Sequence, residues 1–261
     1  MAITSLDNYI AAPKQRLLFQ KTSTVTTVAN QFNGMIQVAG NPGAGVLNVG
    51  NTTNGIVPTN AIAGYPVINA FGGGATGYLT NVEFSNTVLS NLILYDCVYA
   101  IGALAFNVDV SPTSPSWASR NGGSYEGLEI WIEAVTGFTG NQSIQVNYTD
   151  QGGAAGDTGV IATGVAPIIN RMFQIPLAAG DSGVQAITRI RSTVSSAGTF
   201  NLYVLRRLWA NRCILANALF KDDLLKTGMP IVYADSALFT IVQPDSTSSG
   251  LPRIVYEIAN G

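Results

Sequence analysis

Apolar and polar residues alternate along several short segments of the chain, and this pattern predicts β-strands. The clearest case is the segment LEIWIEAV, in which Ile130 and Ile132 fall on one side of the predicted strand. Glu129, Trp131 and Glu133 fall on the other side, because successive side chains of a strand point to opposite faces. We expect the isoleucine side to be buried and the glutamate side to be solvated or part of an interface.

Other segments show the same signals at short spacing. Residues 143–149 alternate, and residues 92–106 form an apolar run that contains Gly102 and is expected to be a buried strand or two. Further strands are expected at 17–28, 78–84, 159–162, 171–176, 184–192, 199–208, 231–234, 238–242 and 253–258. Clusters of Gly, Pro, Asn and Ser separate them, and no alternating βα units are visible, so a parallel sheet is not expected.

Two short helices interrupt this pattern. Ser5 is a suitable N-cap for a helix over 6–12, which a proline then stops. Asn217 is expected to cap a second helix over 218–227, with Gly228 as its C-terminal stop. The sequence therefore predicts a mainly β protein: an antiparallel, jelly-roll-like sandwich with an extended N-terminal region and at most one or two short helices.

Residues 33–77 differ from the rest of the chain because they are rich in Gly and Asn. Such a stretch is unsuited to a long helix, since each Gly costs about 1 kcal/mol relative to Ala. We expect an extended arm or an ordered loop with one or two short strands. The predicted organisation is thus an N-terminal segment with this arm or loop over 1–77 and a β-sandwich domain over 78–261.

Composition narrows the possible functions. The chain has 261 residues, of which 47% are hydrophobic and only 11% charged, with a net charge of −2 and no histidine. The absence of histidine excludes imidazole-dependent catalysis and the usual zinc sites, and the net charge argues against a nucleic-acid partner. Cys97 and Cys213 lie in apolar runs and are expected to be buried thiols. The N-terminus lacks a signal-peptide pattern, and no apolar run reaches the roughly 20 residues of a membrane span.

Three motifs suggest enzymes, but none has the groups that the chemistry needs. The sequence around Asp181 and Ser182 matches a serine-protease motif but lacks the general base that the serine needs. Asp157 and Asp181 each begin an aspartic-protease signature, but the two copies are too close in the chain to lie in separate lobes, and turn chemistry explains them. Glu129 and Glu133 would lie about 13 Å apart on a strand, beyond the roughly 5–9.5 Å of a glycosidase pair. We therefore expect no enzyme, no catalytic or metal-binding residues and no cofactor.

Arginines are the most unevenly distributed charged residues. Six fall within a short span: Arg171, Arg189, Arg191, Arg206, Arg207 and Arg212. Arginine is enriched in protein interfaces, because its planar guanidinium pairs with carboxylates through two hydrogen bonds. The candidate intersubunit contacts are Arg189, Arg191, Arg206 and Arg207. A solvated sheet face and phosphate binding are the alternatives for these residues.

Several turn and strand segments resemble a group of tailed-phage virion proteins. They are LILYD (92–96), WASR with GGSYEG (117–127), LEIWIE (128–133), VNYTDQGG (146–153), AGDSGVQ (179–185), GTFNL (198–202), GMP with YAD (228–235) and the opening AITSLD. The resemblance is spread over most of the chain and contains no catalytic signature. Several members of this group resemble capsid decoration, or cement, proteins that sit on the outside of the icosahedral head as trimers.

This resemblance implies a structural virion protein that binds the outside of the head and stabilises contacts between capsid subunits. Its implied partners are the major capsid protein and two further copies of itself, without nucleic acid or membrane, after assembly in the host cytoplasm. The alternative is a tail or baseplate component with a receptor- or glycan-binding β module, in which Trp117, Tyr125 and Trp131 would stack on sugars. A β-structured depolymerase is a third, weaker possibility, because the carboxylates lack the required spacing.

Overall fold

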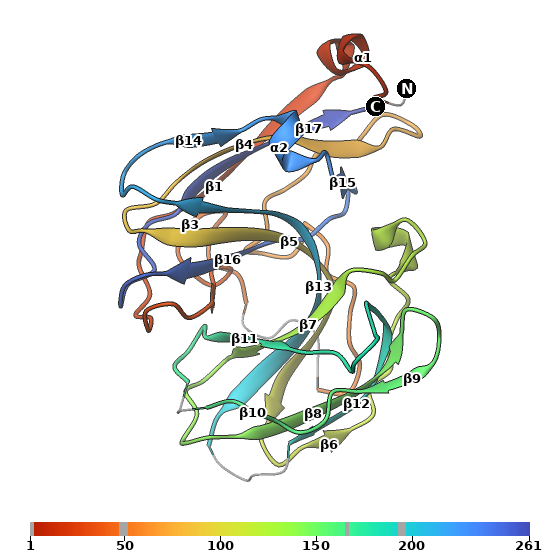
Figure 1. Cartoon of the computed structure of the whole chain (residues 1–261), viewed down its shortest axis with the longest axis vertical. Helices are drawn as coiled ribbons and strands as arrows, with labels where there is room; N and C mark the ends of the chain where they lie inside the picture. The colour runs from red at the N-terminus through yellow and green to blue at the C-terminus, as the bar shows by residue number, and fades with distance from the viewer. Residues whose placement is uncertain (1–2, 47–51, 165–166, 193–196) are drawn as a thin grey trace.

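The computed structural model describes residues 3–46, 52–164, 167–192 and 197–261. These residues form three β-sheets arranged as two sandwiches, one above the other, joined by two long strands (Figure 1). All pairings between the named strands are antiparallel. The predicted mainly β, antiparallel, sandwich-like fold with two short α-helices is confirmed.

The long strands belong to the central sheet, which both sandwiches share. Its order is β11 (Met172–Ile175), β7 (Leu128–Ala134), β13 (Thr199–Cys213), β5 (Ser90–Ala105), β16 (Leu238–Pro244) and β2 (Asn33–Gly34). The upper sheet has the order β14 (Phe220–Asp222), β4 (Gly77–Ser85), β17 (Arg253–Asn260), β1 (Lys14–Lys21) and β3 (Gly40–Asn41), and β15 (Ile231–Val232) also pairs with β4. The lower sheet has the order β10 (Ile161–Ala162), β8 (Ser143–Asp150), β12 (Val184–Ser192) and β6 (Asp109–Val110), with β9 (Ala155–Asp157) on β8.

Three hydrophobic cores cover the central sheet. The core under the upper sheet contains Leu92 and Leu94 of β5, whereas the core against the lower sheet contains Val98 and Ile101 of the same strand. The third core lies on the opposite face of the central sheet and includes Tyr95 and Cys97 of β5 together with side chains from residues 32–65. β5 is therefore buried along both faces, which explains why its sequence is almost continuously apolar rather than alternating.

The Gly- and Asn-rich stretch lies against the body of the protein in its described parts. Met35, Ile36, Val38, Tyr65 and Ile68 are buried, although the described residues between Asn33 and Thr76 form only the two short strands β2 and β3. Residues 47–51 of this stretch lie outside the described residues. β1, which precedes it, pairs with β17 in the upper sheet. The division of the chain at residue 77 stays a prediction.

The first predicted helix is confirmed and the second is wrong over most of its length. Ser5 caps α1 (Leu6–Ala11) by accepting a hydrogen bond from the backbone of Asn8. The predicted second helix instead contains strand β14 (Phe220–Asp222) and only four helical residues, α2 (Leu224–Thr227), which Asp223 rather than Asn217 caps and which end at Gly228 as expected. Phe220 of β14 stacks on Phe84 of β4, with ring centroids 5.5 Å apart. Such packing in the sheet outweighs a local preference for helix.

Both cysteines are buried and free, as expected from their apolar surroundings. Neither of the α-helices that the structure describes is long and apolar enough to cross a membrane.

Asp96 of β5 lies between the upper and lower cores and is fully buried. Its carboxylate accepts hydrogen bonds from Nε (3.3 Å) and Nη2 of Arg120, which lies in the 3₁₀-helix η1 (Ala118–Asn121). Nη2 of Arg206, the cross-strand neighbour on β13, donates at 3.2 Å. The Ser236 hydroxyl donates at 2.7 Å and the Ala237 amide at 3.0 Å.

The two arginines extend this cluster to neighbouring elements. Arg120 Nη1 donates to the Pro58 carbonyl (2.9 Å), and Arg206 Nη2 donates to the Ile231 carbonyl (2.8 Å). The cluster therefore ties the central sheet to η1, to the Gly- and Asn-rich stretch and to β15 of the upper sheet. Because the carboxylate is buried, removing it leaves Arg206 without its anion and leaves Arg120 with only the exposed Asp235, whose Oδ2 lies 3.6 Å from Nη1.

We expect Asp96→Asn to lower the free energy of unfolding by about 3–5 kcal/mol, as measured by urea denaturation. The matched control is Glu83→Gln, which removes a carboxylate that pairs at 2.7 Å with the solvent-exposed Arg16. An exposed pair of this kind contributes roughly 0–1 kcal/mol. Equal losses in the two variants would contradict the role assigned to Asp96.

Candidate interaction surfaces

The structure separates the four predicted contact arginines into two groups on different sheets. Arg189 and Arg191 both lie on β12 of the lower sheet. Arg189 binds Asp109 of β6 with two hydrogen bonds, Nε to Oδ1 at 2.7 Å and Nη2 to Oδ2 at 2.5 Å. Arg191 donates to the side chain of Gln145 on β8. Both guanidinium groups thus have partners within the chain, and their role in intersubunit contacts stays a prediction.

Arg206 and Arg207 lie next to each other on β13 and therefore face opposite sides of the central sheet. Arg206 is largely buried because it belongs to the Asp96 cluster. Arg207 is exposed and lies opposite Tyr95 of β5. Of these two residues, only Arg207 presents its side chain to solvent. Sequence spacing did not reveal the difference, because the partner of Arg206 lies 110 residues away in the chain.

The expectation that Glu129, Trp131 and Glu133 form a solvated or interface face is wrong for the last two. Trp131 and Glu133 are buried beneath the residues that lead into and follow β2. The ring of Phe32 meets Trp131 edge-on, with centroids 5.2 Å apart. Gln37 Nε2 donates to Glu133 at 2.7 Å. The covering residues carry no clear periodic pattern, so the burial of this face could not be predicted from local sequence.

The buried carboxyl of Glu133 has polar partners but no cationic one. Tyr203 Oη donates to it at 2.6 Å, and none of the Lys or Arg side chains in the described residues forms an ion pair with it. Loss of solvent raises the pKa of this carboxyl to about 7, because burial disfavours the charged form.

The aromatic residues named for sugar stacking are also covered. Trp117 and Trp131 are fully buried, and Tyr125 packs against the lower core. Every Phe, Tyr and Trp side chain in the described residues is either buried or only partly exposed. These positions therefore offer no open aromatic platform.

The two Asp-containing turns have structural roles. Asp181 accepts a hydrogen bond from Tyr148 Oη at 2.5 Å, and Asp157 accepts from Gln145 Nε2 and from the Gly159 amide, each at 2.8 Å. Gly159 has a φ of 66°, which suits the tight turn that follows the aspartate. Within the described residues, no three His, Cys, Asp or Glu side chains are placed to hold a metal ion.

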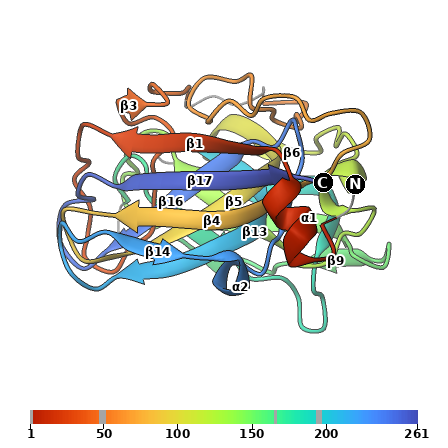
Figure 2. The ribbon, with the colours of Figure 1, turned by 90° about the horizontal axis from the view of Figure 1, so that it is seen from above.

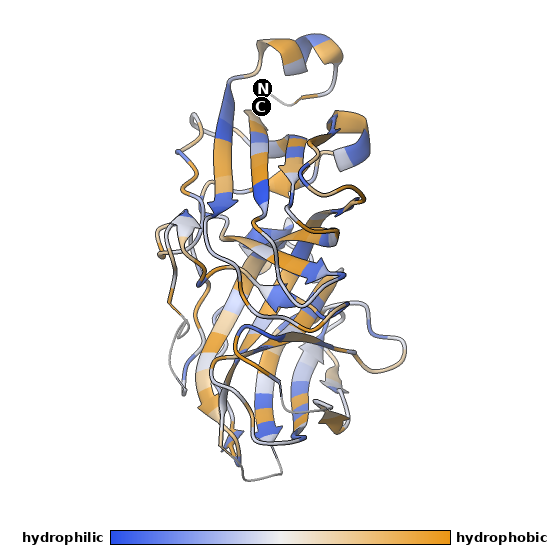
Figure 3. Cartoon of the chain, turned by 90° about the vertical axis from the view of Figure 1, so that its left-hand side faces the viewer, coloured by the Kyte–Doolittle hydropathy of each residue, from blue (hydrophilic) through white to orange (hydrophobic). Residues whose placement is uncertain are grey.

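One end of the upper sandwich carries exposed aliphatic side chains on α1 and α2, and we call it the helix-end surface. Leu6 and Ile10, one turn apart on α1, are each 65% exposed, and Leu225 of α2 is 83% exposed. The C-terminus lies at this end, and α1 projects beyond the sheets with apolar residues on it (Figures 1 and 3). Lys14 Nζ holds α1 in place by donating to the carbonyls of residues 9, 10 and 12.

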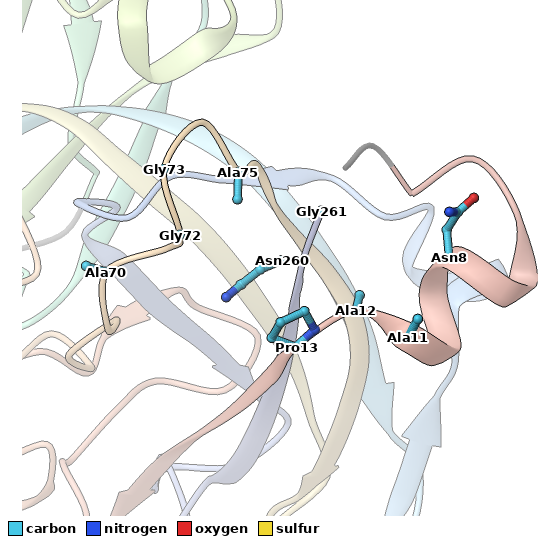
Figure 4. A pocket seen from close by; sticks show the side chains of 10 residues that line it. All are labelled: Asn8, Ala11, Ala12, Pro13, Ala70, Gly72, Gly73, Ala75, Asn260 and Gly261. Atoms are coloured by element: carbon cyan, nitrogen blue, oxygen red, sulfur yellow. The ribbon is translucent and has the colours of Figure 1, made fainter.

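Two hollows adjoin α1 at the helix-end surface. The larger, of about 570 Å³, lies between α1, the loop 70–75 and the C-terminal residues, and small residues line it almost entirely (Figure 4). The lining residues are Asn8, Ala11, Ala12, Pro13, Ala70, Gly72, Gly73, Ala75, Asn260 and Gly261. The second, of about 260 Å³, lies between α1 and α2. A surface with hollows between short apolar helices is suited to receiving side chains of another protein.

The opposite end of the upper sandwich is formed by loops and carries a second set of exposed aliphatic residues, Leu89, Ile214, Leu215 and Leu219, which we call the loop-end surface (Figure 2). The last three are more than half exposed. A hydrogen bond from the Asn217 amide to the Asn86 carbonyl joins their loop to the loop that contains Leu89. Grouped apolar residues on a soluble surface are typical of contacts with a partner.

No protein-family model matches the chain, and no curated protein matches its sequence. Among solved structures, the chain is similar to one in the structure of the infectious bursal disease virus Gx strain, with 8% identity and a TM-score of 0.21 over 95% of this chain and 80% of that chain. A chain of the VP2 subviral particle of the same virus gives 8% identity and a TM-score of 0.22, over 96% and 79%. The weak structural neighbours are viral proteins. Similarity at this level carries no argument about function, which rests on the chain's own residues.

Glu133 makes stability depend on pH in a defined direction. Its ordinary pKa is 4.5, so between this value and about 7 the folded protein holds a proton that the unfolded chain releases. The resulting stability is fully present below pH 4.5 and is lost as pH rises through 7. Glu133→Gln has no such proton to lose. We expect its free energy of unfolding, relative to the parent, to increase by about 3 kcal/mol from pH 4.5 to pH 8.

Urea denaturation of both proteins at pH 4.5 and pH 8 measures this difference. A difference between variant and parent that is the same at both pH values would contradict the burial of an uncompensated carboxyl at this position.

Proposed function

We propose that the protein is a structural virion protein that decorates the outside of a tailed-phage head. In this proposal it forms a trimer, binds the major capsid protein and bridges neighbouring capsid subunits. The resemblance of its turn and strand segments to tailed-phage virion proteins motivates the proposal. The observation that carries it is the pair of exposed aliphatic surfaces at opposite ends of the upper sandwich.

Two surfaces on opposite ends of one body suit a bridging role. Leu6, Ile10 and Leu225 lie at the helix end, whereas Leu215 and Leu219 lie at the loop end, with the upper sheet between them (Figure 2). Contact with a neighbour at each end would bury apolar surface, and each Å² buried would stabilise the contact by about 25 cal/mol. A stable interface needs roughly 800 Å² from each partner, so each surface would form the centre of a larger contact.

The internal pairing of charges supports the same interpretation. Asp96, Arg120 and Arg206 bind one another inside the fold, and Arg189 and Arg212 pair with Asp109 and Asp245. With only 11% charged residues, the remaining surface is unusually poor in charge. Low charge lowers the cost of desolvating a surface against a neighbouring subunit.

The loop-end surface provides the first test of the proposal. Purified protein is expected to cosediment with expanded empty phage heads, and Leu215→Glu with Leu219→Glu is expected to reduce bound protein at least tenfold, because two charges would be buried without partners. Val160→Glu is the matched control, since Val160 is similarly exposed but lies on the lower sheet side of the molecule. Normal binding by the double variant, or equal loss in the control, would contradict a contact at the loop end.

The arginines provide a separate test of the trimer. We expect Arg189→Ala combined with Arg207→Ala to lower the trimer fraction in sedimentation equilibrium and the occupancy on heads. Arg206 is left intact because its replacement would disrupt the buried Asp96 cluster. Unchanged trimer fraction and occupancy would remove Arg189 and Arg207 from the intersubunit contacts.

A further inference from the structure

Arg171 lies immediately before β11 and has a half-buried guanidinium without an anionic partner. Its Cζ sits 4.8 Å from the centre of the Phe173 ring, and its Nη1 is shielded from solvent with no hydrogen-bond partner in the described residues. Every Asp and Glu of the chain lies within the described residues, and none of them forms an ion pair with Arg171.

This arrangement differs from that of other arginines in the protein. Arg16, Arg120, Arg189, Arg206 and Arg212 each pair with a carboxylate. Burial lowers the pKa of the Arg171 guanidinium to about 10, and the group is still positively charged at neutral pH. A partly buried cation without an anionic partner lowers the stability of the folded protein. Residues that are unfavourable for stability in this way are typical of binding sites.

The guanidinium lines a small hollow of about 190 Å³. Val28, Pro167, Ile168 and Phe173 form its apolar wall, and Gln31 and Thr163 add polar groups. Small-molecule sites usually measure roughly 300–1,000 Å³, so this hollow has the size for one side chain rather than for a whole ligand.

The rim of the hollow is aliphatic and open to solvent. Val28 is 49% exposed, and Ile168 is 36% exposed. An arginine surrounded by apolar residues is typical of the hot spots of protein interfaces. The surrounding contacts exclude water and strengthen the bond between the arginine and its partner. A free inorganic anion would leave this apolar rim uncovered.

We infer that the hollow at Arg171 binds the carboxylate side chain of a Glu or Asp from a protein partner, with aliphatic neighbours of that residue packing on Val28 and Ile168. The planar guanidinium supplies donors that match a carboxylate, and the uncompensated positive charge selects an anion. This inference does not rest on the virion proposal, since it specifies the chemistry of the bound segment rather than the particle that contains it.

Peptide titration of the full chain tests this inference. The probes are acetyl-Ile-Glu-Leu-amide and acetyl-Ile-Gln-Leu-amide at millimolar concentration, and the readout is the NMR shift of the Phe173 amide and the Arg171 Nε–H group. We expect saturable shifts with the Glu peptide and at least tenfold weaker binding of the Gln peptide. No saturable shift, or equal binding of both peptides, would overturn the inference. So would equally strong binding of inorganic phosphate.

Variants separate binding from a structural role. Arg171→Met is expected to abolish the Phe173 response, and Arg171→Lys to weaken peptide binding. The control variant Arg16→Gln, which changes an exposed arginine on the upper sheet, should leave peptide binding unchanged. Because the guanidinium lacks a partner inside the fold, Arg171→Met is expected to melt at the same or a higher temperature than the parent. A lower melting temperature would show that Arg171 stabilises the fold, and it would overturn the assignment.

Discussion

Asp96 is a buried carboxylate that holds two arginine side chains at the place where the two sandwiches meet. On β5 it follows Leu94 of the upper core and precedes Val98 of the lower core. A charge at this position is tolerated only because five donor groups surround it. Their elements are thereby fixed relative to the central sheet. The cluster thereby links the central sheet to η1, to the Gly- and Asn-rich stretch and to β15 of the upper sheet.

Strand patterns in the sequence predicted the class of fold because each strand carries its signal locally. The alternation of Ile130 and Ile132 identified the face of β7 that packs on the lower sheet. The opposite face was assigned to solvent, since no local signal shows that distant residues such as Phe32 and Gln37 cover it. The same limit explains β14, where packing of Phe220 on β4 replaced the expected helix.

The candidate surfaces were predicted less well than the fold, for a related reason. The cluster of arginines was visible in the sequence, but Arg206 is held inside by Asp96, whereas Arg207 beside it is exposed. The choice depends on long-range pairing, which spacing along the chain does not encode. Arg171 was noticed as one of six arginines, and only the fold shows that it is partly buried without an anionic partner. The helix-end and loop-end surfaces could be identified only from the exposure of their side chains in the folded chain.

These features are those of a rigid protein that can contact a neighbouring subunit at each end. Its long shared strands make the two sandwiches one unit, and its charges are largely paired within the fold. Apolar side chains remain exposed on short capped helices and tight loops, which hold them in defined positions. Rigid presentation of apolar groups lowers the entropic cost of forming contacts, which suits the proposed role on a capsid.

Cryo-electron microscopy of the purified virion, with this chain built into the density, tests the central claim most directly. The account predicts density on the outer face of the head, in threefold groups, with the helix-end and loop-end surfaces against neighbouring subunits. Density for this chain in the tail or baseplate, with both aliphatic surfaces facing solvent, would contradict it.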